Sequence, residues 1–434
     1  MLSTYSPLLK DPATRRFMTG SSIGRLGGAM FGMSLVAMVS TRSGSFALAG
    51  AVSATGLVVL ALTAVIAGRL TDRYGQRRIT YPLLAWSAVW CAVLVAASSL
   101  QWPRWTLFVS YAMATVVANV GTMSRARWAH RMRDQPDQQH SAMSLEQVVD
   151  ELSFVLGPAI AIGLATLWFP EAGFVVATLL YLVGTLVFLS ERTTEPPVDG
   201  AAHHDTSLAV RVPGIVILAC VLFMTGAIFG SNEVTAIAVA KDQGHPSASG
   251  LVVAVFSLGS AAAGLWFGGR KPSRSLPSLL VVGTGAMFLL EAPILLAEHL
   301  VPIAVVMMFA GAATAPTLII SMQLAQRLVP GTQVNEAMSV VLTGLMIGIA
   351  AGSAISGTVI ENVDPHAGFT VPVAAGGTAL DPEVVAQALL DLVDDRAHLP
   401  VVAGAGQHEG IGDHHLLGDV EGDDVVREFV GGGR

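Results

Sequence analysis

The chain alternates long apolar runs with short polar segments over most of its length. A helix that crosses a bilayer needs about 20 predominantly apolar residues, and eleven runs satisfy this requirement with few charges. We interpret each run as a membrane-spanning helix, because an open strand would leave backbone groups without hydrogen bonds in lipid. The predicted spans are residues 17–40, 44–67, 79–99, 105–123, 142–167, 172–190, 213–237, 247–268, 276–297, 301–323 and 335–360.

A twelfth candidate span, residues 367–380, has only 14 residues before Asp381. A helix of that length cannot cross about 30 Å of hydrocarbon. Residues 381–434 then carry twelve acidic and three basic side chains in a glycine-broken pattern. We expect this tail to be disordered or to come from a shifted reading frame, so that the twelfth span is incomplete.

The composition agrees with a membrane protein. Apolar residues make up 53% of the chain before its 45 glycines are added, and charged residues make up only 13%. A soluble domain carries about 25% charged residues and could not bury this much apolar surface. The net charge of −7 without a basic domain excludes a nucleic-acid binder. Cys91 and Cys220 lie in apolar runs without metal-ligand spacing, so we interpret both as packing residues.

The distribution of lysine and arginine predicts the orientation. With the N-terminus inside, the cytoplasmic segments hold 17 of these residues and the outer loops hold three, Arg42, Arg104 and Lys241. Such an excess is the positive-inside signal of a multi-pass protein in the bacterial inner (plasma) membrane. The N-terminus is therefore expected to be cytoplasmic.

A polar middle segment divides the predicted spans into two sets. It contains a double proline and the pair His203 and His204, which we interpret as linker residues and not as metal ligands, because no further ligand stands at helical spacing. Six spans precede the linker and five or six follow it, which is the layout of a transporter with a central site between two bundles. The predicted organisation is an N-terminal six-helix bundle at 1–190, a cytoplasmic linker at 191–212, a C-terminal bundle at 213–380 and an acidic tail at 381–434.

The most specific motif joins spans two and three. Residues 68–78 read GRLTDRYGQRR, in which glycines permit tight turns and Asp72 can accept hydrogen bonds from backbone donors at a helix start. This segment resembles the loop between spans two and three of the major facilitator superfamily, with Gln76 where a basic residue is usual. The resemblance extends over roughly residues 15–380 and implies an all-helical fold of two six-helix bundles. It also implies that the loop latches the bundles together, through Gly68, Asp72, Arg73, Gly75 and Arg77.

A second motif lies in span five. Glu146, Asp150, Ser153 and Gly157 form one stripe along the helix, and Pro158 follows. The stretch is similar to the glycine-proline motif of the superfamily's proton-coupled exporters, such as the drug-efflux permeases of actinobacteria. Gly157 and Pro158 would allow close packing and a bend where the bundles rock. Unlike many of these exporters, span four is expected to have no buried arginine, only Arg125 and Arg127 at its inner end.

Charged residues inside spans one and five indicate proton coupling. Arg25, Asp150 and Glu151 lie about 12–14 Å deep by the helical rise, so that Arg25 can pair with a carboxylate. Two adjacent carboxylates cannot both be ionised cheaply at that depth, which favours a proton relay through Asp150, Glu151 and Glu146 with Arg25. The alternative is a permanent structural ion pair.

Other polar groups at membrane depth are less specific. Asn232 and Glu233 in span seven are candidates for cavity lining, and Glu291 in span nine could line a cation pathway or only reach water. Gly344, Gly348 and Gly352 recur every four residues in span eleven and predict close helix packing.

The sequence thus predicts a monomeric, alternating-access transporter that exports a small organic molecule, a drug-like compound or metabolite, in exchange for protons. An importer or a sugar or metabolite porter on the same scaffold is the alternative, and a membrane-bound sensor fits less well. We expect no enzyme, since the chain has no Walker, HExxH or GxSxG motif. No cofactor, metal or nucleic-acid partner is expected.

Overall fold

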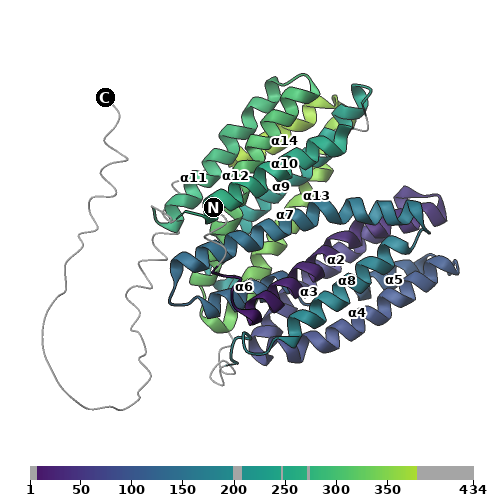
Figure 1. Ribbon diagram of the computed structural model, residues 1–434. Helices are drawn as coiled ribbons and strands as arrows, with labels where there is room; N and C mark the ends of the chain where they lie inside the picture. The colour runs from purple at the N-terminus through teal and green to yellow at the C-terminus, as the bar shows by residue number, and fades with distance from the viewer. Residues whose placement is uncertain (1–6, 199–207, 246–247, 271–273, 379–434) are drawn as a thin grey trace, which may run out of the picture. The chain divides into compact units, whose positions relative to one another are not determined.

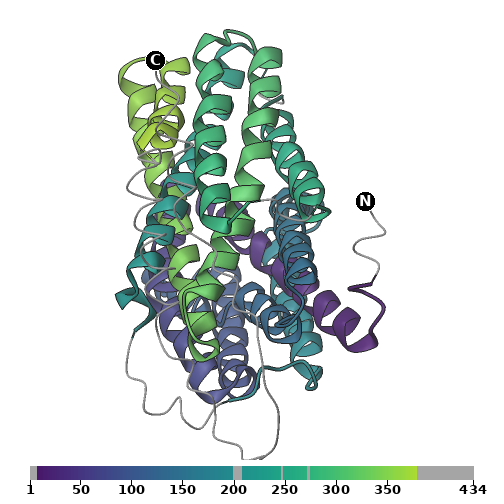
Figure 2. The same ribbon diagram turned by 90° about the vertical axis from the view of Figure 1, so that its left-hand side faces the viewer.

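The computed structural model describes residues 7–198, 208–245, 248–270 and 274–378, and within these ranges the chain is helical. Figures 1 and 2 show the helices packed side by side in two groups, before and after the linker. The first group comprises α2 (Pro12–Ser43), α3 (Phe46–Tyr74), α4 (Gln76–Ser99), α5 (Trp105–Ala114), α6 (Val120–Arg131), α7 (Pro136–Leu167) and α8 (Ala172–Ser190). The second comprises α9 (Pro213–Asp242), α10 (Ser249–Gly268), α11 (Leu276–Glu291), α12 (Leu300–Arg327), α13 (Val334–Asn362) and α14 (Thr370–Thr378). Short 3-10 turns are η2 (Ala209–Arg211), η4 (Ala292–Leu296), η5 (Gly331–Gln333) and η6 (His366–Phe369).

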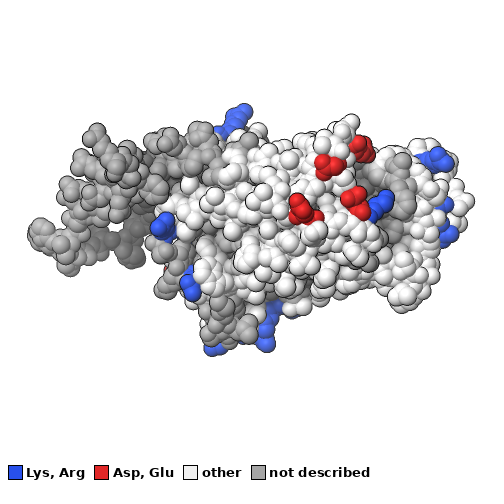
Figure 3. Space-filling view, turned by 90° about the horizontal axis from the view of Figure 1, so that it is seen from above, with Lys and Arg blue, Asp and Glu red and all other residues white. Residues whose placement is uncertain are grey.

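Most helices are longer than the apolar runs that predicted them, because they include polar residues at their ends. Asp11 accepts a hydrogen bond from the Thr14 backbone N–H at 3.1 Å and starts α2 five residues before the predicted span. Within the described ranges, ten helical segments are long and apolar enough to cross a membrane. Many large apolar side chains are exposed on these helices, as expected for surfaces that meet lipid. The view in Figure 3 is mostly uncharged but includes one group of acidic side chains, with Lys and Arg toward the edges.

Span four differs from its prediction. Residues 105–123 were expected to form one helix, but the helix breaks after Ala114 and restarts as α6 at Val120. The carbonyl groups freed by the break accept hydrogen bonds from neighbouring helices: Ser87 donates to the Ala114 carbonyl at 2.7 Å, and Tyr181 donates to the Ala118 carbonyl at 3.2 Å. Non-helical backbone at membrane depth is tolerated only when it is buried and satisfied in this way.

The most extensive helix contact is α2 with α8 in the first group and α9 with α13 in the second. A Cβ atom on Gly184 would collide with the backbone of Gly24, and one on Gly348 would collide with the carbonyl of Phe223. The predicted packing role of the small residues in span eleven is therefore confirmed. These pairs make each group a compact bundle.

The two bundles touch at one end, which we call the arginine-rich end because it carries the segments 68–78, 131–136 and 208–213. There α3 packs against α13, and α7 packs against α10. At the opposite end, the last half of α7 is open to its surroundings, with Leu167 80% exposed and Phe154 55% exposed.

A clamp joins helices of the first bundle at the opposite end. Glu171, in the turn before α8, accepts hydrogen bonds from Arg42 Nε at 2.7 Å and from the Ser98 hydroxyl at 3.2 Å. Burial acts to raise the pKa of Glu171, but the hydrogen bonds from Arg42 outweigh it and hold the pKa below its usual value.

The orientation can be tested by labelling single cysteines after removal of Cys91 and Cys220. Cysteines at Ser43 or Pro103 are expected to react with an impermeant thiol reagent added outside intact cells, and a cysteine at Arg133 only after permeabilisation. All three positions are exposed, so that differences in reactivity report the side of the membrane. The reverse pattern would overturn the predicted orientation.

In the described residues, the twelfth candidate span is represented by η6 and α14. The prediction that the acidic tail 381–434 is disordered or frame-altered lies outside the described residues, as do His203 and His204.

Candidate functional site

A cluster of buried charges lies inside the first bundle. Arg25 on α2 pairs with Glu146 Oε2 at 2.7 Å and with Asp150 Oδ1 at 2.8 Å, and Arg125 on α6 pairs with Asp150 Oδ2 at 2.5 Å. The predicted depth match of Arg25 with Asp150 is thus a direct contact. Two arginines and two carboxylates balance in charge, which lowers the cost of burying them.

Glu146 is further fixed by α6. Its Oε1 accepts a hydrogen bond from the Ser124 hydroxyl at 2.6 Å and one from Trp128 Nε1 at 2.8 Å. Arg125 and Arg127 are 2% and 0% exposed, so the expectation that span four contributes no buried arginine was wrong. The break after α5 explains the error, because the restarted helix α6 directs Arg125 and Arg127 into the bundle.

Glu151 takes a different position from Asp150, because neighbouring residues on a helix point about 100° apart. Its Oε1 accepts a hydrogen bond from the Ser260 hydroxyl of α10 at 2.7 Å and one from Gln147 at 3.1 Å. Ser260 also lies 3.3 Å from the Thr314 hydroxyl of α12. Glu151 is 4% exposed and forms no ion pair with a described residue. It is a buried carboxyl at the junction of the bundles, and the described residues supply no compensating cation.

Glu151 is the last of a row of polar residues on α7 that contact α10. Three α7 side chains bond to α10 backbone carbonyls: His140 to Phe267, Ser141 to Gly268 and Ser144 to Gly264. Gln323 of α12 lies 2.9 Å from His140 Nδ1. The sequence analysis did not predict these contacts between α7 and α10. Polar residues spaced by three or four along the apolar helix were the pattern that could have indicated them.

The 68–78 segment makes the second junction between bundles. Asp72 Oδ1 accepts hydrogen bonds from the Asn335 backbone at 3.1 Å and its side chain at 2.7 Å, and Oδ2 accepts one from the Glu336 backbone at 2.8 Å. These donors are the free N–H groups at the start of α13, where a helix favours negative charge. Gly68 lies inside α3 and not in a turn, and a Cβ there would collide with the Asn335 carbonyl and with Ser339.

Arg69 Nε of the segment also lies 4.0 Å from Glu336 Oε2 of α13, whereas Gly75, Gln76, Arg73 and Arg77 contact the first bundle. Gly75 has a φ of 92°, which few other residues adopt, and it separates α3 from α4. Gln76 accepts a hydrogen bond from Arg127 Nε at 2.9 Å and donates to the Met123 carbonyl at 3.1 Å. The guanidinium groups of Arg73 and Arg77 lie 5.4 and 5.6 Å from the ring centres of Tyr74 and Tyr81.

Loss of Asp72 is expected to slow transport more than it destabilises the protein. Asp72→Ala removes three hydrogen bonds between bundles, each worth about 1–3 kcal/mol, and shifts the balance of conformers. We expect turnover to fall about tenfold or more, measured as initial transport rate per folded molecule. Asp11→Ala is the matched control, because Asp11 also caps a helix but bonds within one bundle. Unchanged turnover in Asp72→Ala would reduce the segment to an anchor.

The remaining predicted residues are distributed between packing and surface positions. Gly157 contacts Ala29 of α2 at a distance that leaves little room for a side chain, and Pro158 lies inside α7. Cys91 is buried as expected, but Cys220 is exposed. On α9, Asn232 is 2% exposed and Glu233 is exposed, so the two side chains point in different directions.

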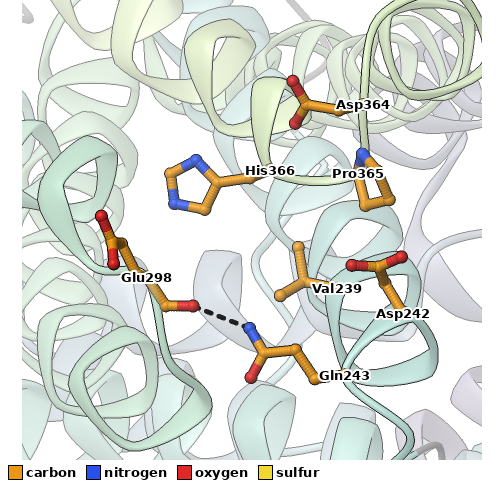
Figure 4. A pocket seen from close by; sticks show the side chains of 7 residues that line it. All are labelled: Val239, Asp242, Gln243, Glu298, Asp364, Pro365 and His366. Carbon is orange, nitrogen blue, oxygen red and sulfur yellow. Dashed lines mark hydrogen bonds between the residues drawn. The ribbon is translucent and has the colours of Figure 1, made fainter.

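A cavity of about 220 Å³ opens at the opposite end of the second bundle (Figure 4). Three carboxyl-bearing residues line it, Asp242, Glu298 and Asp364. Figure 4 shows them around the cavity with His366, and Gln243 donates a hydrogen bond to the Glu298 carbonyl at 2.8 Å. No group of three or more His, Cys, Asp or Glu side chains with metal-binding geometry occurs in the part of the chain that the structure describes.

Two bundles joined by a linker, with buried charges where they meet, define a secondary transporter of the membrane. A sequence profile of the Major Facilitator Superfamily matches residues 17–290 and 218–401, and the chain belongs to this superfamily. It is a non-enzymatic, multi-pass transporter whose relatives bind small molecules within the membrane.

Similar proteins agree with this assignment. The chain is 24% identical over 374 residues to the uncharacterized MFS-type transporter y4rN of Sinorhizobium fredii, covering 82% of this chain and 91% of the relative. The fold is similar to the human organic anion transporter MFSD10, with a TM-score of 0.66 at 17% identity over 87% of this chain and 100% of that one. It is also similar to a bacterial homologue of the iron transporter ferroportin in its outward-facing state, with a TM-score of 0.67 at 13% identity over 88% and 99% of the two chains.

Proposed function

We propose that the chain exports a small organic molecule in exchange for protons and that Glu151 carries the coupling proton. The observation that supports this role most strongly is the hydrogen bond from Ser260 to Glu151 across the bundles. A proton at this carboxyl would be bound at the point where the bundles separate.

The arrangement supplies a route from proton binding to conformational change. An ionised Glu151 accepts hydrogen bonds from Ser260 and Gln147, which favours the closed arginine-rich end. Protonation weakens the acceptor and reduces the attraction between the bundles, so it favours opening at that end. Because the effect is reciprocal, the state open toward the cytoplasm binds the proton more tightly, and substrate that enters from the cytoplasm would displace the proton there.

Asp150 and Glu146 have a different proposed role. Their ion pairs with Arg25 and Arg125 balance the charges of the cluster and connect α2, α6 and α7 within the first bundle. This assigns to them the structural alternative considered for the cluster, and leaves Glu151 as the titrating group.

The export direction and the organic substrate are proposed from the resemblance of the 68–78 and 146–163 segments to drug-efflux permeases. The name of the human organic anion transporter, a protein of the same fold, is consistent with an organic substrate. Bundles whose described contacts lie at the arginine-rich end correspond to an outward-open state of such an exporter.

The proposal is tested by reconstituting the protein in liposomes that contain a pH-sensitive dye. A panel of drug-like compounds is added to vesicles with an imposed pH gradient, and we expect at least one compound to release protons down the gradient at an accelerated rate. An uncoupler should abolish its accumulation. Compounds that move with the proton instead of against it would identify an importer, and compound transport that ignores the gradient would refute proton coupling.

A further inference from the structure

A second buried carboxyl lies in the C-terminal bundle, apart from the site at the bundle junction. Glu291 is the last residue of α11 and is 1% exposed, and its Oε1 has no hydrogen-bond partner among the described residues. Asn232 of α9 faces it and is 2% exposed. Neither atom of the Asn232 amide has hydrogen-bond geometry to a described partner. Two buried polar side chains therefore face each other with unused bonding capacity.

No described cation compensates Glu291. The helices and turns packed around α11 are α12, α14 and η4, and along their lengths the sequence contains one charged residue, Arg327, at the far end of α12. On α9, the neighbouring carboxyl is Glu233, whose side chain is exposed. An ionised carboxylate without a partner is costly at membrane depth, whereas the protonated form carries no charge and can donate its O–H to the Asn232 oxygen.

A row of positions on α9 connects this pair with the acidic cavity of Figure 4. Thr235 lies about one turn beyond Asn232, is fully buried, and has a hydroxyl without a hydrogen-bond partner. Val239, about one turn further along α9, lines the cavity. Glu291 is likewise close to the cavity in sequence, because η4 leads from it to the lining residue Glu298.

We propose that Glu291 and Asn232 form a proton-binding site within the C-terminal bundle, reached from the acidic cavity past Thr235. The carboxylates of the cavity raise the local concentration of cations, and the Thr235 hydroxyl can relay a proton because it both accepts and donates. The site is separate from Glu151 and does not rest on the proposed export activity.

The ligand that fits is a proton and not a metal ion. A hard cation such as Mg²⁺ or Ca²⁺ takes six or more oxygen ligands, whereas the pair offers one carboxyl and one amide. A proton requires a single acceptor and leaves both side chains satisfied.

The test is infrared difference spectroscopy of the full-length protein in lipid as the pH is changed. We expect the wild-type protein to show the C=O stretch of a protonated carboxyl that disappears at alkaline pH. Glu291→Gln should remove the component of this band that Glu151 does not contribute. Asn232→Leu should shift the frequency of that component, because the hydrogen bond from the carboxyl is lost while Glu291 remains. Glu233→Gln is the matched control on the same helix and should leave the band unchanged.

The variant pair keeps the experiment decisive if one protein does not fold, since Asn232→Leu assigns the band without altering Glu291. A spectrum of Glu291→Gln or of Asn232→Leu that is identical to the wild-type spectrum would refute the site. Replacing Na⁺ by choline should have no effect, and a titration midpoint that moves with Na⁺ would assign the site to a metal cation instead. A failure of the export assay would not affect this proposal, because the infrared spectra and the Na⁺ replacement both require no substrate.

Discussion

Glu151→Gln is expected to abolish transport driven by a pH gradient while leaving the protein folded and able to bind substrate. Glutamine keeps the size of the side chain and can still accept the hydrogen bond from Ser260, but it cannot release or bind the coupling proton. The measurement is compound-dependent proton flux in liposomes, compared with binding of the same compound to detergent-solubilised protein. Flux should fall to the level of empty vesicles, and exchange of substrate without a gradient should persist.

Two companion variants define what is lost. Glu361→Gln replaces an exposed glutamate near the end of α13 and should retain coupled flux. Ser260→Ala removes the donor from α10 but keeps the carboxyl, so we expect coupling to persist with an altered pH dependence. Wild-type flux in Glu151→Gln would transfer the coupling role to another residue.

Asp150→Asn is expected to destabilise the first bundle rather than to uncouple transport. The substitution leaves Arg25 and Arg125 with one carboxylate between them, and breaking a buried pair in this way costs about 3–5 kcal/mol. Thermal unfolding of the purified variant should therefore begin well below that of the wild type. Glu171→Gln is the control, because its partner Arg42 is 37% exposed and can turn to water, so a smaller loss is expected.

A double variant tests whether the stability of the cluster depends on its charge balance. Arg125→Gln combined with Asp150→Asn restores equal numbers of positive and negative side chains in the cluster. It should be more stable than the sum of the single changes predicts, which is the signature of direct coupling. Strictly additive losses would mean that the cluster is not an energetic unit.

Hydropathy predicted the spans well because lipid imposes one requirement on every residue of a helix. Hydropathy averaged along the chain could not detect the break in span four, since residues 115–119 are about as apolar as α5 before them. The contact of Arg25 with Asp150 could be predicted, because two charges at one depth have few other ways to be neutralised.

The partners of Asp72 and Glu151 could not be predicted in the same way. Asp72 bonds mainly to backbone N–H groups, which every helix start possesses, and Ser260 is one of several small polar residues in apolar runs. Both contacts depend on how the bundles meet, and a single sequence records helix patterns more directly than distances between helices. Glu151 and Asp150 are neighbours in sequence, yet only the structure shows that one faces the ion cluster and the other faces α10.

The glycine contacts along α9 and α13 have a mechanical consequence. With backbones so close, neither helix can slide or tilt without displacing the other, so the pair behaves as a single stiff rod. Asp72 holds this rod at the first residues of α13, while Asn232 lies further along its other member. A pull or release at the arginine-rich end would therefore be transmitted along the length of the bundle without hinging within it, and residues that never touch would move in step.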